Sequence, residues 1–90
     1  MLSDIADERD REEVLRESGK FSATCATVGE HRMDDFQCLA VLGEEFGEVS
    51  RAVCEQIAGN IENRAHLRTE LVQVAAVAVA WVERLDLEAK

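Results

Sequence analysis

Apolar residues recur at helical spacing through the middle of the chain. At about 100° per residue, six large apolar side chains fall within a sector of roughly 80°. They are Leu39, Leu42, Phe46, Val49, Val53 and Ile57. This stripe predicts a helix over about residues 35–58, capped by Asp34 or Asp35 and ended by Gly59 and Asn60. We expect the stripe to be the face of this helix that forms the core.

The following segment is apolar on nearly every side. Residues 71–82 are apolar except at Gln73, and they predict a helix over about residues 62–87. A helix that is hydrophobic all round must be covered all round. An expected first helix over residues 3–18, capped by Ser3 and ended near Gly19, has too few apolar residues to provide that cover. A second subunit is therefore the natural cover.

These patterns predict an all-α fold with about three helices in each chain. The stretch from residue 20 to 33 has no clean period and predicts a connecting loop, with at most a short helical turn. No linker or repeat divides the 90 residues, so they predict one domain, and a chain of this size has difficulty enclosing a large core alone. We therefore expect a helical bundle completed by oligomerisation, as a homodimer or as a tetramer built from two dimers.

Composition and charge narrow the possible partners. The chain has no Pro, 5 Gly and 47% hydrophobic residues, which favours helices over strands. Its formal charge of −9 argues against a nucleic-acid polymer, because phosphate binding relies on Lys and Arg. The longest apolar stretch, residues 74–82, is too short to span a bilayer, and the first residues lack the pattern of a signal peptide. We expect a cytoplasmic protein that does not interact with membranes.

The three cysteines indicate reduced thiols. Cys25, Cys38 and Cys54 are odd in number and form no CxxC or Cys/His pattern. A zinc site is therefore the less favoured interpretation.

Acidic residues occur beside the apolar stripe. Glu45 lies at the shoulder of the stripe with Glu48 one turn on, whereas Glu44 points nearly opposite it. On the last helix, Glu70 and Gln73 are aligned polar groups in an apolar setting. A buried carboxylate is costly unless it is paired or bound to a cation, and oxygen ligands suit Mg²⁺ or Mn²⁺. The alternative is that Glu45 and Glu48 belong to an ordinary solvated face.

Two segments resemble the MazG-like branch of the all-α nucleoside triphosphate pyrophosphohydrolases. EEFGE at residues 44–48, followed after 21 residues by ELVQVAAVAVAWVE at residues 70–83, is similar to the EExxE, spacer and ExxD pattern of that family. The resemblance covers residues 35–85. ERDR at residues 8–11 and KF at residues 20–21 resemble a further segment of MazG-like proteins more weakly.

The resemblance implies a reaction and a set of site residues. It implies hydrolysis of a nucleoside triphosphate to the monophosphate and pyrophosphate, with Mg²⁺ as cofactor. Glu45, Glu48 and Glu70 would be the metal ligands and the catalytic acids, and Glu44 would lie just behind them or contact water on the metal. Gln73 stands where the family has Asp, so it would be a neutral fourth ligand, which either suits this subfamily or weakens turnover.

Several other polar residues are candidates for substrate binding. His66 lies one turn before Glu70 and could touch phosphate or metal, or could simply be partly exposed. Four basic residues could pair with phosphate oxygens, namely Lys20, Arg51, Arg64 and Arg68. Arg51 and Arg68 could equally form salt bridges with the surplus acids. The competing hypothesis for the whole chain is a non-enzymatic helical oligomer, a regulatory or structural module with a residual metal or nucleotide site.

Overall fold

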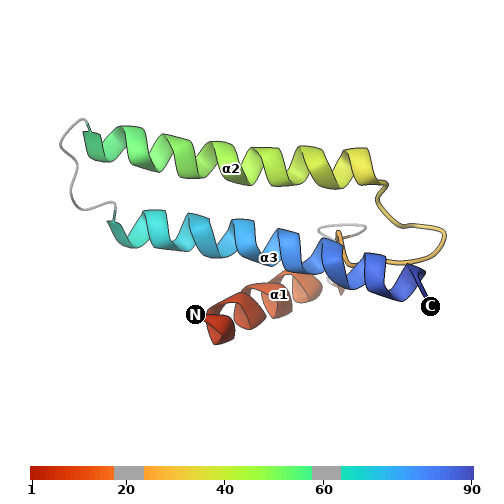
Figure 1. Cartoon of the computed structure of the whole chain (residues 1–90). Helices are drawn as coiled ribbons and strands as arrows, with labels where there is room; N and C mark the ends of the chain where they lie inside the picture. Colours follow the sequence, from red (N-terminus) through yellow and green to blue (C-terminus); the bar gives the residue numbers. More distant parts are fainter. Residues whose placement is uncertain (18–23, 58–63) are drawn as a thin grey trace.

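Three helices make up the fold in a computed structural model that describes residues 1–17, 24–57 and 64–90. They are α1 (Leu2–Glu17), α2 (Asp35–Ile57) and α3 (Arg64–Glu88), and the described residues include no strand. The all-α prediction is confirmed for this part of the chain. Helices α2 and α3 run antiparallel side by side, and α1 crosses α3 on the side away from α2 (Figure 1). Helix α3 is thus the central element.

The start of α2 is fixed by a capping box. The Asp34 carboxylate accepts a hydrogen bond from the Gln37 backbone N–H at 2.7 Å, and the Gln37 side chain accepts one from the Asp34 N–H at 2.8 Å. These bonds satisfy backbone donors that a helix start leaves free, so the helix begins where the sequence predicts. The described part of the expected loop, residues 24–34, contains no helix.

The first helix begins earlier than its expected cap. Helix α1 begins at Leu2, and the Met1 carbonyl accepts hydrogen bonds from the N–H groups of Asp4 and Ile5. The prediction that Ser3 caps this helix is therefore wrong, because Ser3 lies inside the helix. The expected helix ends at Gly19, Gly59 and Asn60 lie outside the described residues.

A fully buried arginine ties the end of α3 to the start of α2. Arg84 has 0% of its surface exposed, and its guanidinium donates to the Met33 carbonyl and to the Asp35 carboxylate. The Arg84 Nη1 atom also lies 3.3 Å from Cys38 Sγ. Trp81, one turn earlier on α3 and half-buried, donates from Nε1 to the same Asp35 carboxylate at 3.0 Å. This network holds the loop before α2 against α3.

The core is small and lies at that same end of the molecule. Its buried members are Cys25, Cys38, Val77 and Ala80, and half-buried apolar residues pack around them. Elsewhere, α1 is held to α3 by ion pairs, Arg9 with Glu83 at 2.5 Å and Arg68 with Asp4.

The apolar stripe of α2 is only partly turned toward this core. Leu42 packs against the core and Val49 is half-buried, which agrees with the prediction for these two residues. Leu39, Phe46 and Val53 are 58%, 63% and 40% exposed, so the prediction that they form the core face is wrong for the single chain. The buried positions of α2 are the small side chains Cys38 and Ala52. Small residues let two helix backbones approach closely, which leaves the larger side chains on the outer side of the contact.

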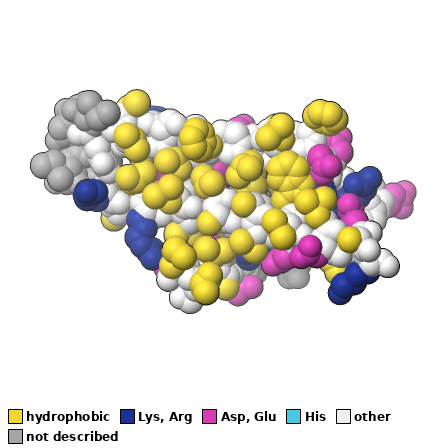
Figure 2. Space-filling model, viewed as in Figure 1, with side chains coloured by type: hydrophobic (Ala, Val, Ile, Leu, Met, Phe, Trp, Pro, Cys, Tyr) yellow, Lys and Arg dark blue, Asp and Glu magenta, His cyan; other side chains and the backbone are white. Residues whose placement is uncertain are grey.

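One face of the molecule is consequently rich in exposed apolar side chains. Figure 2 shows apolar side chains gathered over α2 and α3. The exposed large apolar side chains of α3 include Leu71, Val79 and Val82. The radius of gyration is 14.4 Å, whereas a compact domain of this length would have about 12 Å. The chain is therefore more elongated than a compact domain of this length. No helix among the described residues is long and apolar enough to cross a bilayer.

Candidate functional site

Glu45 and Glu70 meet at the contact between α2 and α3, with Gln73 between them. With its amide nitrogen turned toward the two acids, Gln73 donates to Glu70 Oε2 at 2.9 Å and to Glu45 Oε2 at 3.2 Å. Glu70 is only 7% exposed, and Glu45 is half-buried. The antiparallel pairing of α2 and α3 thus brings together two acids that are 25 residues apart in the sequence.

Glu70 has a second partner on its own helix. His66 lies one turn earlier, and its Nε2 is 3.4 Å from Glu70 Oε1. The histidine is exposed while the glutamate is buried. His66 and Gln73 therefore hold the two oxygens of one carboxylate from opposite sides along α3.

The electrostatics around Glu45 are those of crowded carboxylates. Burial raises the pKa of the Glu45 carboxyl above its ordinary value, and the charge of Glu70 raises it further. Three more acids act in the same direction: Glu8, Glu48 and Glu44. A cation bound between Glu45 and Glu70 would relieve this repulsion.

The oxygen atoms of this site suit one particular way of binding a divalent cation. Within residues 1–17, 24–57 and 64–90, no group of three or more His, Cys, Asp or Glu side chains is arranged to hold a metal ion. Magnesium, however, is commonly bound by one or two carboxylates, with water and substrate phosphates completing the shell. Glu45, Glu70 and the carbonyl oxygen of Gln73 fit that mode.

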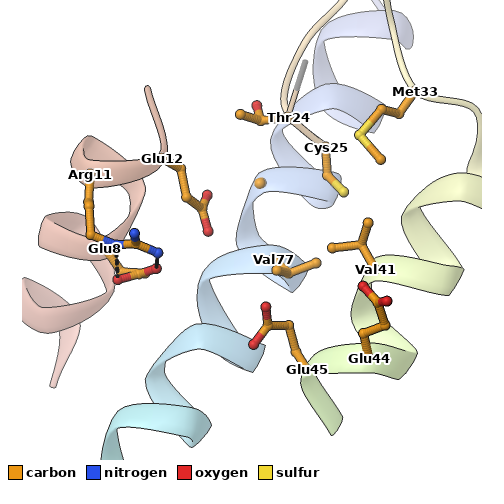
Figure 3. Close-up of a pocket in the computed structure, with 11 residues that line it drawn as sticks. Glu8, Arg11, Glu12, Thr24, Cys25, Met33, Val41, Glu44, Glu45 and Val77 are labelled. Atoms are coloured by element: carbon orange, nitrogen blue, oxygen red, sulfur yellow. Dashed lines mark hydrogen bonds and ion pairs between the residues drawn. The ribbon is translucent and has the colours of Figure 1, made fainter. Parts of the chain in front are cut away.

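A cavity of about 370 Å³ opens beside Glu45 (Figure 3). It lies between α1, the loop before α2, and the α2/α3 pair. Its apolar wall consists of Cys25, Met33, Val41, Val77 and Ala80. Burial raises the pKa of the Cys25 thiol to about 12, so this sulfur is an apolar wall atom at neutral pH rather than a nucleophile.

Helix α1 supplies polar side chains to the same cavity. Glu8, Arg11 and Glu12 line it together with Glu44 and Glu45. Arg11 is bound to Glu8 by two hydrogen bonds, of 3.0 and 2.5 Å. In Figure 3, the Glu12 side chain extends from α1 into the space that Glu45 enters from α2.

Glu12 has an altered acidity. Burial raises the pKa of Glu12 to about 7, against the opposing effect of the Arg9 charge. The charges of Glu8 and Glu45 raise the pKa, and that of Arg11 lowers it. This carboxyl therefore changes its charge near neutral pH.

The remaining candidate residues are dispersed. Glu44 is exposed but lines the cavity, and Glu48 is exposed one turn beyond Glu45. Arg51 pairs with Glu55 on its own helix at 3.4 Å, while Arg68 pairs with Asp4, so the salt-bridge interpretation of both arginines holds.

Two further basic residues were candidates from the sequence. Arg64 is exposed at the first turn of α3, and Lys20 lies outside the described residues.

The contribution of α1 could not be found from the sequence alone. Residues 8–13, ERDREE, have the alternating charge of a solvated helix face, and nothing in that pattern shows which neighbour the helix meets. Glu8, Arg11 and Glu12 are spaced three and four residues apart, so they lie on one face of the helix. That shared face is the sequence feature that indicates a contact with another helix.

The three cysteines are free thiols, as expected from their number and spacing. Cys25 and Cys38 are buried in the core, and Cys54 is exposed on α2. No known protein family, curated protein or solved structure matches the chain. The functional argument therefore depends on the motif spacing and on the site itself.

Proposed function

We propose that this chain is a MazG-like nucleoside triphosphate pyrophosphohydrolase, which hydrolyses an NTP or dNTP to the monophosphate and pyrophosphate with Mg²⁺, or with Mn²⁺ in its place. The observation that supports this is the meeting of Glu45 and Glu70 through Gln73. These positions match two acids and one polar residue of the EExxE and ExxD pattern, and they come together across the α2/α3 contact.

In this proposal, Glu45 and Glu70 hold the cation, and the carbonyl oxygen of Gln73 turns toward it. Glu48, one turn along α2, adds a carboxylate through a bound water. A bound Mg²⁺ would neutralise phosphate charge and lower the pKa of a coordinated water. His66 keeps Glu70 in place from the side opposite Gln73.

We further propose that a second copy of the chain covers the exposed apolar face, as a homodimer or as a dimer of dimers. The support is the outward stripe of α2, with Leu39 and Phe46 more than half exposed, and the uncovered side of α3. An apolar surface of this kind is the usual mark of a binding interface. A second copy that completes the bundle would bury the α2 stripe and the uncovered side of α3.

One observation favours the second candidate function, a non-enzymatic helical module. With its nitrogen turned toward the two acids, the Gln73 amide donates a hydrogen bond to each of them, at 2.9 and 3.2 Å. A neutral donor in this place can stabilise a helix contact by itself, since a buried carboxylate requires hydrogen-bond donors. In that case, the acids would serve folding only.

Turnover separates the two candidates. We expect pyrophosphate release from at least one member of a panel of NTPs and dNTPs in the presence of Mg²⁺ or Mn²⁺. Glu45→Gln should lower kcat by at least about a hundredfold, because Glu45 would hold the cation that neutralises phosphate charge in the transition state. Pyrophosphate release and a metal-dependent rise in Tm are measured on the same samples.

The matched control is Asp86→Asn, which removes an exposed carboxylate from the far part of α3. It should leave turnover unchanged. If no substrate is hydrolysed and Mg²⁺ does not change the Tm, the pyrophosphohydrolase proposal is wrong and the helical module stands.

A further inference from the structure

The cavity and the proposed cation site share a wall. Glu45 belongs to both, because it accepts a hydrogen bond from Gln73 and also lines the cavity. A phosphate chain held at Glu45 and Glu70 therefore has this cavity as the adjoining space for the rest of the molecule. Its volume, about 370 Å³, is within the range of roughly 300 to 1,000 Å³ that small-ligand sites occupy.

The two ends of the cavity differ in chemistry. Met33 and Val77 belong to the apolar wall, where a flat, weakly polar ring can be buried. The polar side carries Glu12 from α1, and Arg11 is the one cationic side chain among the described residues of the lining. Arg11 is 55% exposed, which leaves its guanidinium accessible from the solvent side.

We propose that this cavity holds the nucleoside end of the substrate, with the base against Met33 and Val77 and with Glu12 hydrogen-bonding to the edge of the base. This inference rests on the function proposed above, and it makes Glu12 the residue that selects between bases. A carboxyl oxygen accepts hydrogen bonds from ring and amino N–H groups, whose arrangement differs from base to base. Arg11 lies where it can pair with a phosphate oxygen at the opening.

The two methionines of the chain provide a direct test. Met33 lines the cavity, whereas Met1 is 79% exposed at the start of α1 and serves as an internal control. Protein labelled with ¹³C at the methionine methyl groups is titrated with AMP, GMP, CMP and UMP and their deoxy forms, each with Mg²⁺. Inorganic tripolyphosphate, which has no nucleoside, is titrated in parallel.

We expect a saturable shift of the Met33 methyl signal with at least one nucleotide, no shift with tripolyphosphate, and no shift of Met1. If the Met33 signal does not move with any nucleotide while the protein hydrolyses NTPs, the cavity assignment is wrong and the proposed reaction stands. If Met33 shifts but no NTP is hydrolysed, the cavity assignment holds and the pyrophosphohydrolase proposal fails.

Filling the cavity should block binding. Val41→Phe places a ring in the apolar wall, and we expect nucleotide binding to weaken by at least tenfold. Val28→Phe, at an exposed position of the loop before α2 that does not line the cavity, is the matched control and should bind normally. Unchanged binding by a folded Val41→Phe variant would contradict the assignment, and if the variant does not fold, the Met33 titration decides.

The role of Glu12 in base selection is tested separately. Glu12→Gln keeps one acceptor oxygen and replaces the other carboxyl oxygen with an N–H donor group, so the ratio of kcat/KM between bases should change by about tenfold. Asp7→Asn, an exposed change on α1, should leave that ratio unaltered. An equal loss for all bases, or a change only between ribose and deoxyribose, would overturn the assignment of Glu12 to the base.

Discussion

With its nitrogen turned toward the acids, the amide of Gln73 on α3 reaches the carboxylate of Glu45 on α2, at 3.2 Å from Oε2. The same nitrogen is 2.9 Å from Oε2 of Glu70, so one neutral side chain bridges two acids. An amide has both a donor and an acceptor end. Gln73 can therefore donate to the two carboxylates without a cation and offer its carbonyl oxygen when a cation is bound.

Replacing this amide with a third acid should make folding depend on metal. In Gln73→Asp, the two donated hydrogen bonds are lost and a further negative charge joins Glu45 and Glu70. We expect the free energy of unfolding to fall by about 1 to 3 kcal/mol without divalent cations. Added Mg²⁺ should recover most of this loss, and urea unfolding with and without Mg²⁺ measures both effects.

The control for this variant is Thr69→Asp, which adds an acid on the exposed side of α3 next to Glu70. Its stability should be nearly independent of Mg²⁺. If Mg²⁺ fails to stabilise Gln73→Asp beyond the control, Glu45 and Glu70 do not form a cation site.

Glu12 should make stability decrease as the pH rises. Its ordinary pKa of 4.5 is raised to about 7 in the fold, so between these values the folded chain binds more protons than the unfolded chain. The free energy of unfolding therefore falls with increasing pH in this window. Because the side chain is only half-buried, solvent screening reduces the effect, and we expect Glu12→Gln to gain about 1 to 2 kcal/mol at pH 8.

The same variant should show only about a quarter of this gain at pH 5, because pH 5 lies just above the unfolded pKa of 4.5 and most of the window up to pH 7 has not yet been crossed. Urea unfolding of both proteins from pH 5 to 8 gives the comparison. Asp7→Asn on the exposed side of α1 corrects for the change in net charge. A gain that is equal at both pH values would show that the Glu12 carboxyl is not the titrating group.

The helices were predictable because their signals are local. The start of α2 follows from Asp34 and Gln37, which satisfy each other's backbone donors within four residues. The meeting of Glu45 with Glu70 agrees with the sequence-based expectation, in which Glu45 lies at the shoulder of the apolar stripe and Glu70 is a polar group in an apolar helix.

The orientation of α2 was not predictable in the same way. The strength of an apolar stripe shows that a face must be covered, but not whether the cover is α3 or another subunit. Here Cys38 and Ala52 face inward because small side chains permit close packing, while Phe46 is left outside. The burial of Arg84 likewise depends on Asp35, 49 residues away, and no local pattern reports such a partner.

Arg84 should be one of the largest contributors to stability. Arg84→Ala removes hydrogen bonds to the Met33 carbonyl and to Asp35 and leaves a void beside the core. We expect a loss of about 2 to 4 kcal/mol in the free energy of unfolding. Arg32→Ala, which removes an exposed arginine paired with Glu88, should cost less than about 1 kcal/mol. Similar losses in the two variants would contradict the bridging role of Arg84.

Phe46 should control assembly rather than the fold of the single chain. Its side chain is 63% exposed, so Phe46→Ser removes little packing within one chain. If a second copy covers the stripe, each lost ring costs about 1.5 to 3 kcal/mol of burial, and the Kd of the dimer should rise at least tenfold. Sedimentation equilibrium measures the Kd, with Leu2→Ser on the exposed start of α1 as the control. A monomeric starting protein, or equal Kd values for both variants, would show that the α2 stripe is not the interface between copies.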